Sequence, residues 1–219
     1  MWIERLIEPV VLDRARTRPV VGLTGARQTG KTSLVRRLFP THDYVSLDLP
    51  SEAEQAENDP SAFLSRHPAP LIVDEVQYAP GLLRHLKREV DARRDDNGRF
   101  ILTGSQPFEL MTGVAESLAG RAAVLTLGGL SYAEILRARP ETTVEEAILR
   151  GGFPELHAKP DIDARGFFQS YVATRLAMRP PPYRSPRSLR FSPEPSRAGC
   201  PNHDRRMPAV LMTSLCSSG

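Results

Sequence analysis

One segment of the sequence constrains the fold more than any other. Residues 25–32 read GARQTGKT and satisfy the pattern G-x-x-x-x-G-K-[ST]. The apolar, β-branched run 19–23 precedes this segment, and SLVRRLF follows it before Pro40 ends the helical pattern. A strand, a glycine-containing loop and a helix in this order predict a phosphate-binding loop. The alternative is an ordinary tight turn with an incidental lysine.

The spacing within this phosphate loop suits a nucleoside triphosphate. Gly25 and Gly30 let the backbone curl so that successive N–H groups point at phosphate oxygens, and the following helix adds its positive end. We expect Lys31 to reach the β- and γ-phosphates and the Thr32 hydroxyl to ligate Mg²⁺. The candidate nucleotide-binding residues are Gly25, Ala26, Arg27, Gln28, Thr29, Gly30, Lys31, Thr32 and Ser33.

A second motif, LIVDE, ends an apolar run with two acids. The run 71–73 is typical of a strand buried on both faces, and we expect it to lie beside the strand of the phosphate loop. Asp74 would then hold the Mg²⁺ shell through water, while Glu75 would take a proton from the attacking water. The alternative is a pair of solvated acids at a strand end.

The second of these acids also discriminates among reactions. A carboxylate that polarises water favours hydrolysis, whereas a kinase needs a site for an acceptor. The sequence contains no N-K-x-D guanine motif, which argues against a GTPase of the Ras type.

Two later strand ends carry further candidates. FILTGS places Thr103 and Ser105 where a fourth strand ends, and such a hydroxyl is suited either to orienting the lytic water and sensing the γ-phosphate or to capping the next helix. Arg121, in SLAGR, is suited to supplying charge to the γ-phosphate of a neighbouring subunit. Its alternative role is a favourable position near a helix C-terminus.

Strand and helix patterns alternate along the first part of the chain. This alternation predicts an α/β fold with a mainly parallel five-stranded sheet and helices on both faces. Strands are expected at 19–23, 44–49, 71–73, 100–103 and 123–127. Helices are expected at 33–39, after a Ser51–Glu54 capping box, after Asp59–Pro60, at 81–94 and at 108–119.

The strand pattern then stops and a helical region begins. Capping boxes at Ser131–Glu134 and Thr142–Glu145 predict two helices, Gly151–Gly152 ends the second, and Asp163 begins a third. The predicted organisation is a sheet domain with the phosphate loop at 1–128, a small helical subdomain at 129–174 and a tail at 175–219.

The tail differs sharply in composition. It holds eight Arg, eight Pro and seven Ser with two acids, so it carries +6 while residues 1–174 carry −3, which together give the net +3. Three interpretations stay open: a frameshift or truncation, a disordered linker, and a basic arm for phosphate backbones. Because residues 1–174 are mildly acidic, we do not expect the core to bind nucleic acid.

Cysteine and hydropathy patterns bear on location. Cys200 and Cys216 both lie in the tail, and their irregular spacing with His203 favours chance over a metal site. MWIERLIEPV lacks a signal-peptide pattern, and no apolar run approaches the roughly 18 residues that a membrane span needs. We therefore expect a cytoplasmic protein without membrane association.

The ordered set GARQTGKT, LIVDEVQ, FILTGS, SLAGR and GGFPE resembles the prokaryotic AAA+ ATP-binding proteins, whose ATPase core is normally followed by a C-terminal domain of poorly defined function. The resemblance covers residues 15–174. It implies an ASCE-type P-loop NTPase sheet and a helical lid over the nucleotide. It also implies Glu75 as catalytic base, Ser105 as sensor and Arg121 as a candidate finger. Asp48, in YVSLDLP, receives no catalytic role.

This resemblance implies ATP and Mg²⁺ as cofactors and, as partners, a homo-oligomer or a protein or domain moved by the hydrolysis cycle. The alternative function is a nucleotide-dependent switch with little turnover. In the family the last helix continues with a charged amphipathic pattern, whereas here it runs into RLAMRPPPYRSPRS. We therefore expect a chain that is truncated or frameshifted after residue 174.

Overall fold

The protein is described here by a computed structural model that covers residues 2–105 and 117–177, with side chains through residue 174. Residues 1–173 form one compact unit, and residues 174–219 form a second, most of which lies outside the described residues. The tail, with the Cys200, His203 and Cys216 grouping, therefore stays a prediction. Within the described ranges, no helix is long and apolar enough to cross a membrane.

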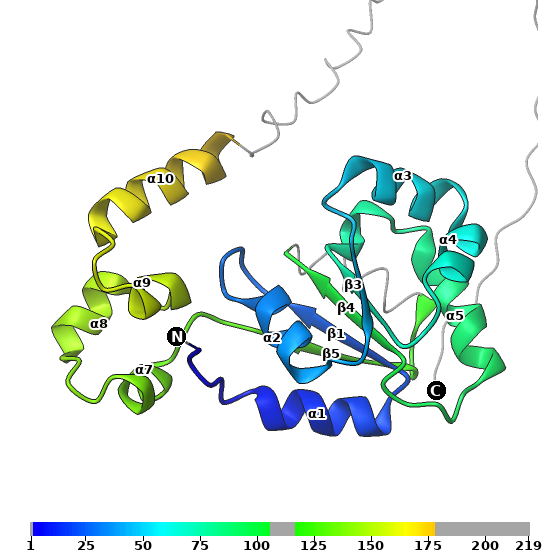
Figure 1. Cartoon of the computed structure of the whole chain (residues 1–219), viewed down its shortest axis with the longest axis horizontal. Helices are drawn as coiled ribbons and strands as arrows, with labels where there is room; N and C mark the ends of the chain where they lie inside the picture. The colour runs from blue at the N-terminus through cyan, green and yellow to red at the C-terminus, as the bar shows by residue number, and fades with distance from the viewer. Residues whose placement is uncertain (1, 106–116, 178–219) are drawn as a thin grey trace, which may run out of the picture. The chain divides into compact units, whose positions relative to one another are not determined.

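A parallel β-sheet occupies the centre of the first unit (Figure 1). In the part of the chain described, it has five strands in the order β2–β3–β4–β1–β5. The strands are β1 (Val20–Thr24), β2 (Asp43–Ser46), β3 (Leu71–Asp74), β4 (Phe100–Gly104) and β5 (Ala122–Thr126). Every neighbouring pair is parallel, which confirms the predicted fold class of a P-loop NTPase sheet.

The prediction that β3 lies directly beside β1 was wrong. Strand β4 lies between them and pairs with both, Val21 facing Ile101 on one side and Ile72 facing Ile101 on the other. All three strands are buried along their whole length, so their hydrophobicity alone does not rank them within the sheet. As a result Thr103, near the end of β4, contacts both Asp74, the last residue of β3, and the backbone of Glu75.

One face of the sheet is covered by α1 (Glu8–Thr17) and α2 (Lys31–Leu38). Side chains of alternate strand residues, including Val21, Ile72 and Ile101, pack there against Leu34 and Val11. Helix α1 was not predicted, because only Val11 and Ala15 of its ten residues are buried and its charges hide the pattern.

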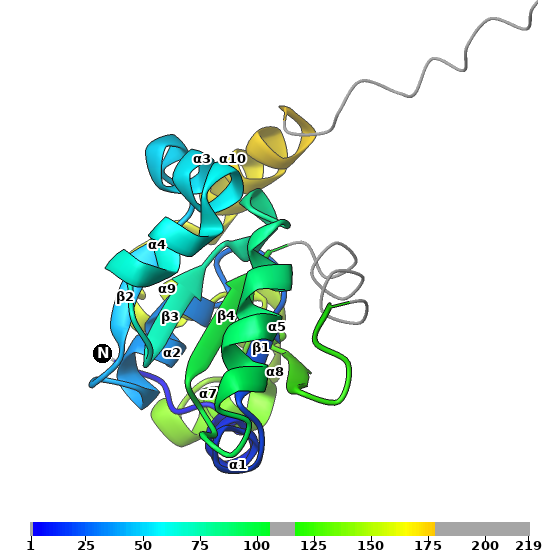
Figure 2. The same ribbon diagram turned by 90° about the vertical axis from the view of Figure 1, so that its right-hand side faces the viewer.

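The opposite face is covered by α3 (Pro50–Asn58), α4 (Pro60–Arg66) and α5 (Leu82–Ala92). Figure 2 looks onto α5 with the strands behind it. The core of this face combines the other alternate strand residues, such as Val20, Val73 and Leu102, with Leu86 and Phe63. A 3₁₀ turn, η1 (Val76–Tyr78), links β3 to α5.

Two helix starts on this face test the capping predictions. Helix α3 begins at Pro50 with Leu49 as N-cap, so the predicted Ser51–Glu54 capping box was wrong. Proline at the first helical position supplies a preset φ and needs no N–H partner, which moves the start upstream. Helix α4 starts as expected, because the Asp59 side chain accepts a hydrogen bond from Ala62 N at 3.0 Å.

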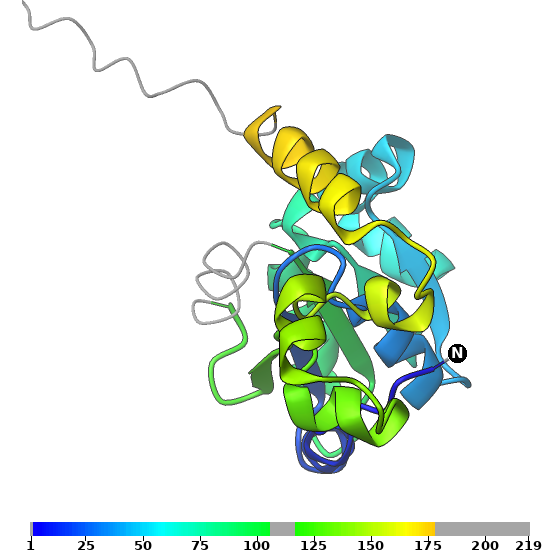
Figure 3. The same cartoon turned by 90° about the vertical axis from the view of Figure 1, so that its left-hand side faces the viewer.

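Among the described residues, four further helices follow the sheet, and Figure 3 faces the first three: α7 (Tyr132–Ala138), α8 (Val144–Arg150) and α9 (Pro154–Ala158). The fourth is α10 (Ala164–Ala177). We call α7 to α9 the lid helices, after the helical lid that the family resemblance implies; that they cover a nucleotide stays a prediction. Helix α9 was not predicted, since its five residues are too few for a periodic pattern. The helix expected at 108–119 falls mostly on residues 106–116, outside the described residues.

The lid helices partly match their predicted caps. The Ser131–Glu134 capping box is present with both reciprocal bonds. The cap predicted at Thr142 and Glu145 was one residue early: Thr143 is the N-cap of α8 and accepts from Glu146 N at 3.2 Å. Thr142 instead is buried, at 4% exposure.

Candidate functional site

The phosphate loop has the backbone that its glycines were expected to allow. Gly25 and Gly30 have φ of 148° and 88°, and Gln28 is a non-glycine residue at φ 62°. A Cβ on Gly25 would lie 2.1 Å from the Leu127 carbonyl oxygen, so only glycine fits against the end of β5 at that position. Thr29 Oγ1 donates to the Ala26 carbonyl at 2.9 Å and closes the loop on itself.

Lys31, the first residue of α2, turns back over this loop. Its Nζ donates to the carbonyl oxygens of Gly25 at 3.0 Å and Ala26 at 2.9 Å, and the residue is only 5% exposed. A buried ammonium is costly unless it is hydrogen-bonded, and these carbonyls meet that need. The arrangement keeps a positive charge beside the backbone N–H groups of the loop and the N-terminus of α2.

Asp74, at the end of β3, accepts hydrogen bonds from hydroxyl groups of three separate elements. Thr32 Oγ1 lies 3.0 and 2.9 Å from its two carboxylate oxygens, and the Tyr44 hydroxyl lies 2.9 Å from Oδ2. Thr103 Oγ1 of β4 donates to Oδ1. Burial and the negative charge of Asp74 raise the pKa of Tyr44, which keeps this phenol a donor. The predicted metal pair, Thr32 and Asp74, is therefore in direct contact.

These oxygens suit a hard cation that also binds phosphate. Mg²⁺ prefers oxygen ligands and is usually held by one or two carboxylates together with substrate phosphates. Across the described residues there is no group of three or more His, Cys, Asp or Glu side chains able to hold a metal ion. Thr32 and Asp74 offer oxygen atoms of the kind that such a cation binds.

Glu75 follows Asp74 in a left-handed backbone conformation, with φ 56° and ψ 46°. For a non-glycine residue this conformation costs about 1–2 kcal/mol, and such strain gathers at functional sites. Here it turns the chain sharply out of β3 into η1. The Glu75 N–H donates to Thr103 Oγ1 at 3.3 Å.

Neutral donors hold the Glu75 carboxylate. Ser105 donates to Oε2 through its hydroxyl at 2.8 Å and its backbone N–H at 3.1 Å, and Gln77 Nε2 donates to the same oxygen. Burial pushes the pKa of Glu75 upward, but the bonds from Gln77 and Ser105 and the charge of Lys31 outweigh it and lower the pKa overall. Glu75 is therefore ionised at neutral pH.

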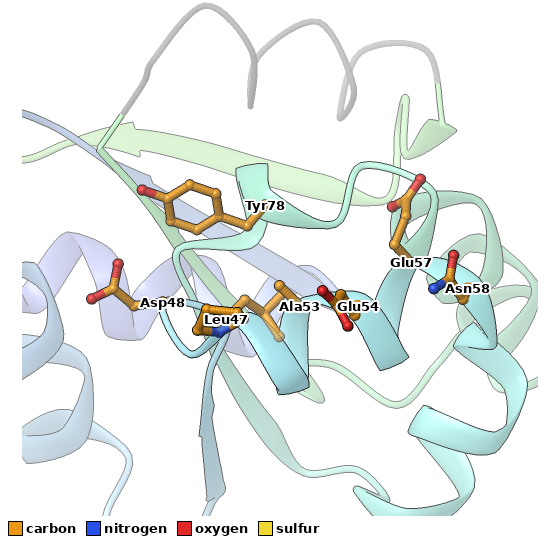
Figure 4. Close-up of a pocket in the computed structure, with 8 residues that line it drawn as sticks. Leu47, Asp48, Ala53, Glu54, Glu57, Asn58 and Tyr78 are labelled. Atoms are coloured by element: carbon orange, nitrogen blue, oxygen red, sulfur yellow. The ribbon is translucent and has the colours of Figure 1, made fainter. Parts of the chain in front are cut away.

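A surface pocket of about 510 Å³ lies next to η1 (Figure 4). Asp48 and Tyr78 line it, together with residues of α3 such as Glu54 and Ala53. The Tyr78 hydroxyl accepts from Arg27 of the phosphate loop at 3.2 Å. Asp48 thus lines this pocket, while Asp74 and Glu75 form the cluster at the end of β3.

Comparison with known families decides the relationship of this chain. Residues 17–136, which include the phosphate loop, Asp74 and Glu75, match the model of a family described as AAA domain. The chain belongs to this family. The predicted resemblance to prokaryotic AAA+ ATPases is thereby confirmed, and membership of the AAA domain family supports nucleotide binding.

Two curated proteins resemble this AAA domain chain over most of its length. Both are called uncharacterized proteins, Rv2008c of Mycobacterium tuberculosis and Mb2031c of Mycobacterium bovis. Each is 33% identical over 179 residues, which cover 80% of this chain and 40% of the relative. The chain therefore spans about 40% of the length of the curated relatives it matches.

A solved structure shares the fold. The Walker-type ATPase PABY2304 of Pyrococcus abyssi superposes with a TM-score of 0.52 at 19% identity, covering 81% of this chain and 74% of that one. This match supports the assignment of the AAA domain as a P-loop NTPase sheet with helices.

Arg121 lies away from the cluster that the other candidates form. It immediately precedes β5, and its carbonyl accepts from Val20 N at the start of β1, so it lies at the opposite end of the parallel strands from the phosphate loop. Its guanidinium binds Asp91 through Nε at 2.6 Å and Nη2 at 3.0 Å. A role in this AAA domain's own site is excluded by position, and the role toward a neighbouring subunit stays a prediction.

Three contributors to the site were missed in the sequence. Gln77 lies within LIVDEVQ, but a glutamine two residues after an acid is no signal by itself. Tyr44 begins a predicted strand, and only the pairing of β2 with β3 brings it to Asp74. Arg5 has no local signal at all, and yet its buried guanidinium contacts the phosphate loop of the AAA domain.

Proposed function

We propose that this chain binds ATP and hydrolyses it in the presence of Mg²⁺. One observation carries the proposal: a phosphate loop with a buried lysine lies beside a carboxylate in contact with Thr32 and a second, ionised carboxylate one residue later. These are the groups that phosphoryl transfer to water requires.

Binding is proposed to start at the phosphate loop. Its backbone N–H groups and the Lys31 ammonium would hold the phosphates, with the loop residues 25–33 as the binding set. A cavity of about 190 Å³ adjoins the loop at Thr29 and Gly30. Its other walls are Trp2, Ile3, Arg5, Ser33, Pro154, Glu155 and Ala158. We assign the nucleotide base to this cavity, because an aromatic ring and aliphatic side chains suit a flat base.

Thr32 and Asp74 would hold Mg²⁺, which when bound neutralises phosphate charge and orients the transferring group. The Thr32 hydroxyl would turn an oxygen lone pair to this site, while Thr103 and Tyr44 keep the Asp74 carboxylate in place. A cation and Lys31 together offset the negative charge that a triphosphate brings next to two acids.

In the proposed hydrolysis, Glu75 acts as general base. A water oxygen attacks the γ-phosphorus and the bond from that phosphorus to the bridging oxygen breaks, so that the electron pair leaves with ADP and the water proton passes to the Glu75 carboxylate. The three bonds from Ser105 and Gln77 all go to Oε2. We assign proton acceptance to Oε1, and we assign to Ser105 the role of a sensor that links the carboxylate to the end of β4.

The proposal also includes a role for Arg121 and a partner that the hydrolysis cycle moves. Arg121, at the far end of the strands, would act on the nucleotide of a neighbouring copy, and the hydrolysis cycle would move a partner protein or domain. The relatives, which are longer than this chain, leave room for such a domain in their own sequences.

A second candidate is a nucleotide-dependent switch with little turnover. The observation that favours it is the clamp on Glu75, because three donors on one carboxylate oxygen restrain the group that would accept the proton. Such a switch binds ATP as proposed above but hydrolyses it little.

The deciding experiment compares phosphate release and ATP binding in wild type, Glu75→Gln and a control, Glu54→Gln. Glu54 is exposed on α3 and lies outside the proposed machinery. We expect Glu75→Gln to lower turnover by about 10²–10⁴-fold with binding kept, and Glu54→Gln to match wild type. Equal, near-background turnover in all three would favour the switch, and absence of ATP binding by wild type would refute both functions.

A further inference from the structure

A buried arginine joins the phosphate loop to the lid helices. Arg5 is 7% exposed. Its Nη1 donates to the Thr29 carbonyl at 2.9 Å, and its Nη2 donates to the carbonyls of Gly128 at 2.9 Å and Gly129 at 3.0 Å. Its Nε donates to Glu134 Oε1 at 3.1 Å. One planar group therefore bonds to the loop, to the segment that leaves β5 and to the first lid helix.

Glu134 completes the connection on the lid side. Its Oε2 accepts from the N–H and hydroxyl of Ser131 at 2.7 and 3.0 Å, and its Oε1 also accepts from Leu6 N at 2.7 Å. Burial acts to raise the pKa of Glu134, but the backbone donors and Arg5 lower it overall, so Glu134 is ionised at neutral pH. The capping box of α7 is thus also the anchor of Arg5.

The backbone already brings the two sides close together. A Cβ on Gly25 would meet the Leu127 carbonyl, and a Cβ on Gly129 would lie 2.9 Å from the Gly152 carbonyl oxygen. Leu127 N donates to Thr24 O at 2.7 Å and Leu130 N to Gly152 O at 2.7 Å. There is little slack between the loop, the segment 127–130 and the lid helices, so movement of one must be accommodated by the others.

The bond to Thr29 has a direct consequence for phosphate binding. In a trans peptide the carbonyl and the next N–H point in opposite directions. Fixing the Thr29 carbonyl toward Arg5 therefore aims the Gly30 N–H away from Arg5. Because loop N–H groups bind phosphate, the orientation of this peptide plane decides whether one of them is available.

We propose that Arg5 is a positioning residue that couples the phosphate loop to the lid helices. It holds the Thr29–Gly30 peptide plane for phosphate binding and transmits any displacement of that plane to the segment 127–130 and to α7 through Glu134. Arginine is required because lysine lacks the planar fork that serves several acceptors at once. The role rests on the proposed nucleotide binding, but the coupling itself exists in the chain without nucleotide.

The simpler explanation is a buried ion pair that only supports the fold. Buried pairs are weak evidence for stability, since the cost of desolvation offsets their attraction. The two explanations differ in where a change at one end is felt. A purely stabilising pair affects the whole unit or its immediate contacts, whereas coupling carries a change at Glu134 to the phosphate loop, which Arg5 contacts through Thr29.

The test is amide hydrogen exchange on the full chain for wild type, Arg5→Lys, Glu134→Gln and the control Arg14→Lys. The control places the same arginine-to-lysine change on α1, where Arg14 forms an exposed ion pair with Asp13. Without nucleotide, we expect both site variants to accelerate exchange about tenfold in residues 26–33 and 128–138 together, with β4 and α5 unchanged and the control like wild type. If Arg5→Lys does not fold, Glu134→Gln decides alone.

Acceleration confined to 128–138 in Glu134→Gln, or spread evenly over β4 and α5, would overturn the coupling. With ATP added, wild type is expected to gain protection in 128–138, and Arg5→Lys is expected to bind ATP about tenfold more weakly and to lose that gain. If wild type binds no ATP, the proposed function fails, and the exchange pattern without nucleotide still decides the coupling.

Discussion

The sheet and the lid helices are held together by different forces. Every residue of β1, β3 and β4 is buried, and apolar side chains from both faces surround them. In contrast, residues 144–150 of α8 include no buried side chain, and Ile148 and Leu149 are 74% and 72% exposed. The lid has a smaller apolar cluster around Leu130 and Ile135, and polar bonds fix its corners, such as those from Arg150 to the Leu156 and Pro160 carbonyls at 2.8 and 2.9 Å.

This difference indicates how the molecule divides rigidity and movement. Apolar burial gives the sheet a large cooperative stability, whereas a few polar bonds allow local opening at lower free energy. The proposed catalytic groups are attached to the rigid part, at the strand ends, and we expect the lid to respond to what binds there through the contacts of Arg5 with Thr29 and Glu134.

The largest effect is expected from truncating the two regions in the same way. Leu102→Ala removes a fully buried side chain from β4 and should lower the free energy of unfolding by about 2–5 kcal/mol. Ile148→Ala removes a mostly exposed side chain from α8 and should change it by no more than about 0.5 kcal/mol. Urea unfolding followed by circular dichroism measures both. Equal losses would contradict the contrast between sheet and lid.

An intermediate effect is expected from the helix caps of the lid. Ser131→Ala removes a hydroxyl that both accepts from Glu134 N and donates to its carboxylate, and should cost about 1 kcal/mol of local stability in α7. Thr143→Ala, the matched change at α8, removes one such bond and should cost less. Hydrogen exchange of the amides of α7, α8 and β1 reports each change. An equal increase in β1 would mean that lid and sheet open as one unit.

The smallest effect concerns acid. Glu75 at the sheet and Glu134 at the lid both have a pKa below the ordinary value, although burial alone would raise each pKa. Their stabilisation is therefore complete above the unfolded-state pKa of about 4.3 and is lost as pH falls through the lower folded-state pKa. We expect the urea midpoint of wild type to fall over that acidic range and that of Glu134→Gln to fall less steeply. Identical slopes would show that Glu134 titrates as it does in the unfolded chain.

The parts that sequence predicted well are those in which neighbouring residues suffice. The phosphate loop contains its glycines, lysine and threonine within eight positions, so its geometry follows from local backbone preferences. Strands such as β4 begin with an apolar run, and Ser131 with Glu134 forms a cap within one turn. Each of these features can be predicted from neighbouring residues, without knowledge of the rest of the chain.

The parts that sequence missed depend on distant residues. The insertion of β4 between β1 and β3 follows from competition among equally apolar strands, which no local pattern resolves. Arg5 and Glu134 are 129 positions apart, and an arginine near the N-terminus is ordinarily solvated. The Tyr44 hydroxyl reaches Asp74 only because β2 and β3 pair in register, Ser46 beside Asp74.

The register of β4 between β1 and β3 has a consequence for insertions and deletions. Side chains alternate between the faces of a strand, so one residue added to β4 ahead of Thr103 would move its hydroxyl to the other face and shift it by about 3.3 Å along the strand. Asp74 would lose a donor and the Glu75 backbone its acceptor, although no site residue had been replaced. An insertion in β4 is thus expected to disrupt the site even though the middle of that strand contains no site residue. The reason is that the pairing register of β1, β3 and β4 positions the residues at their ends.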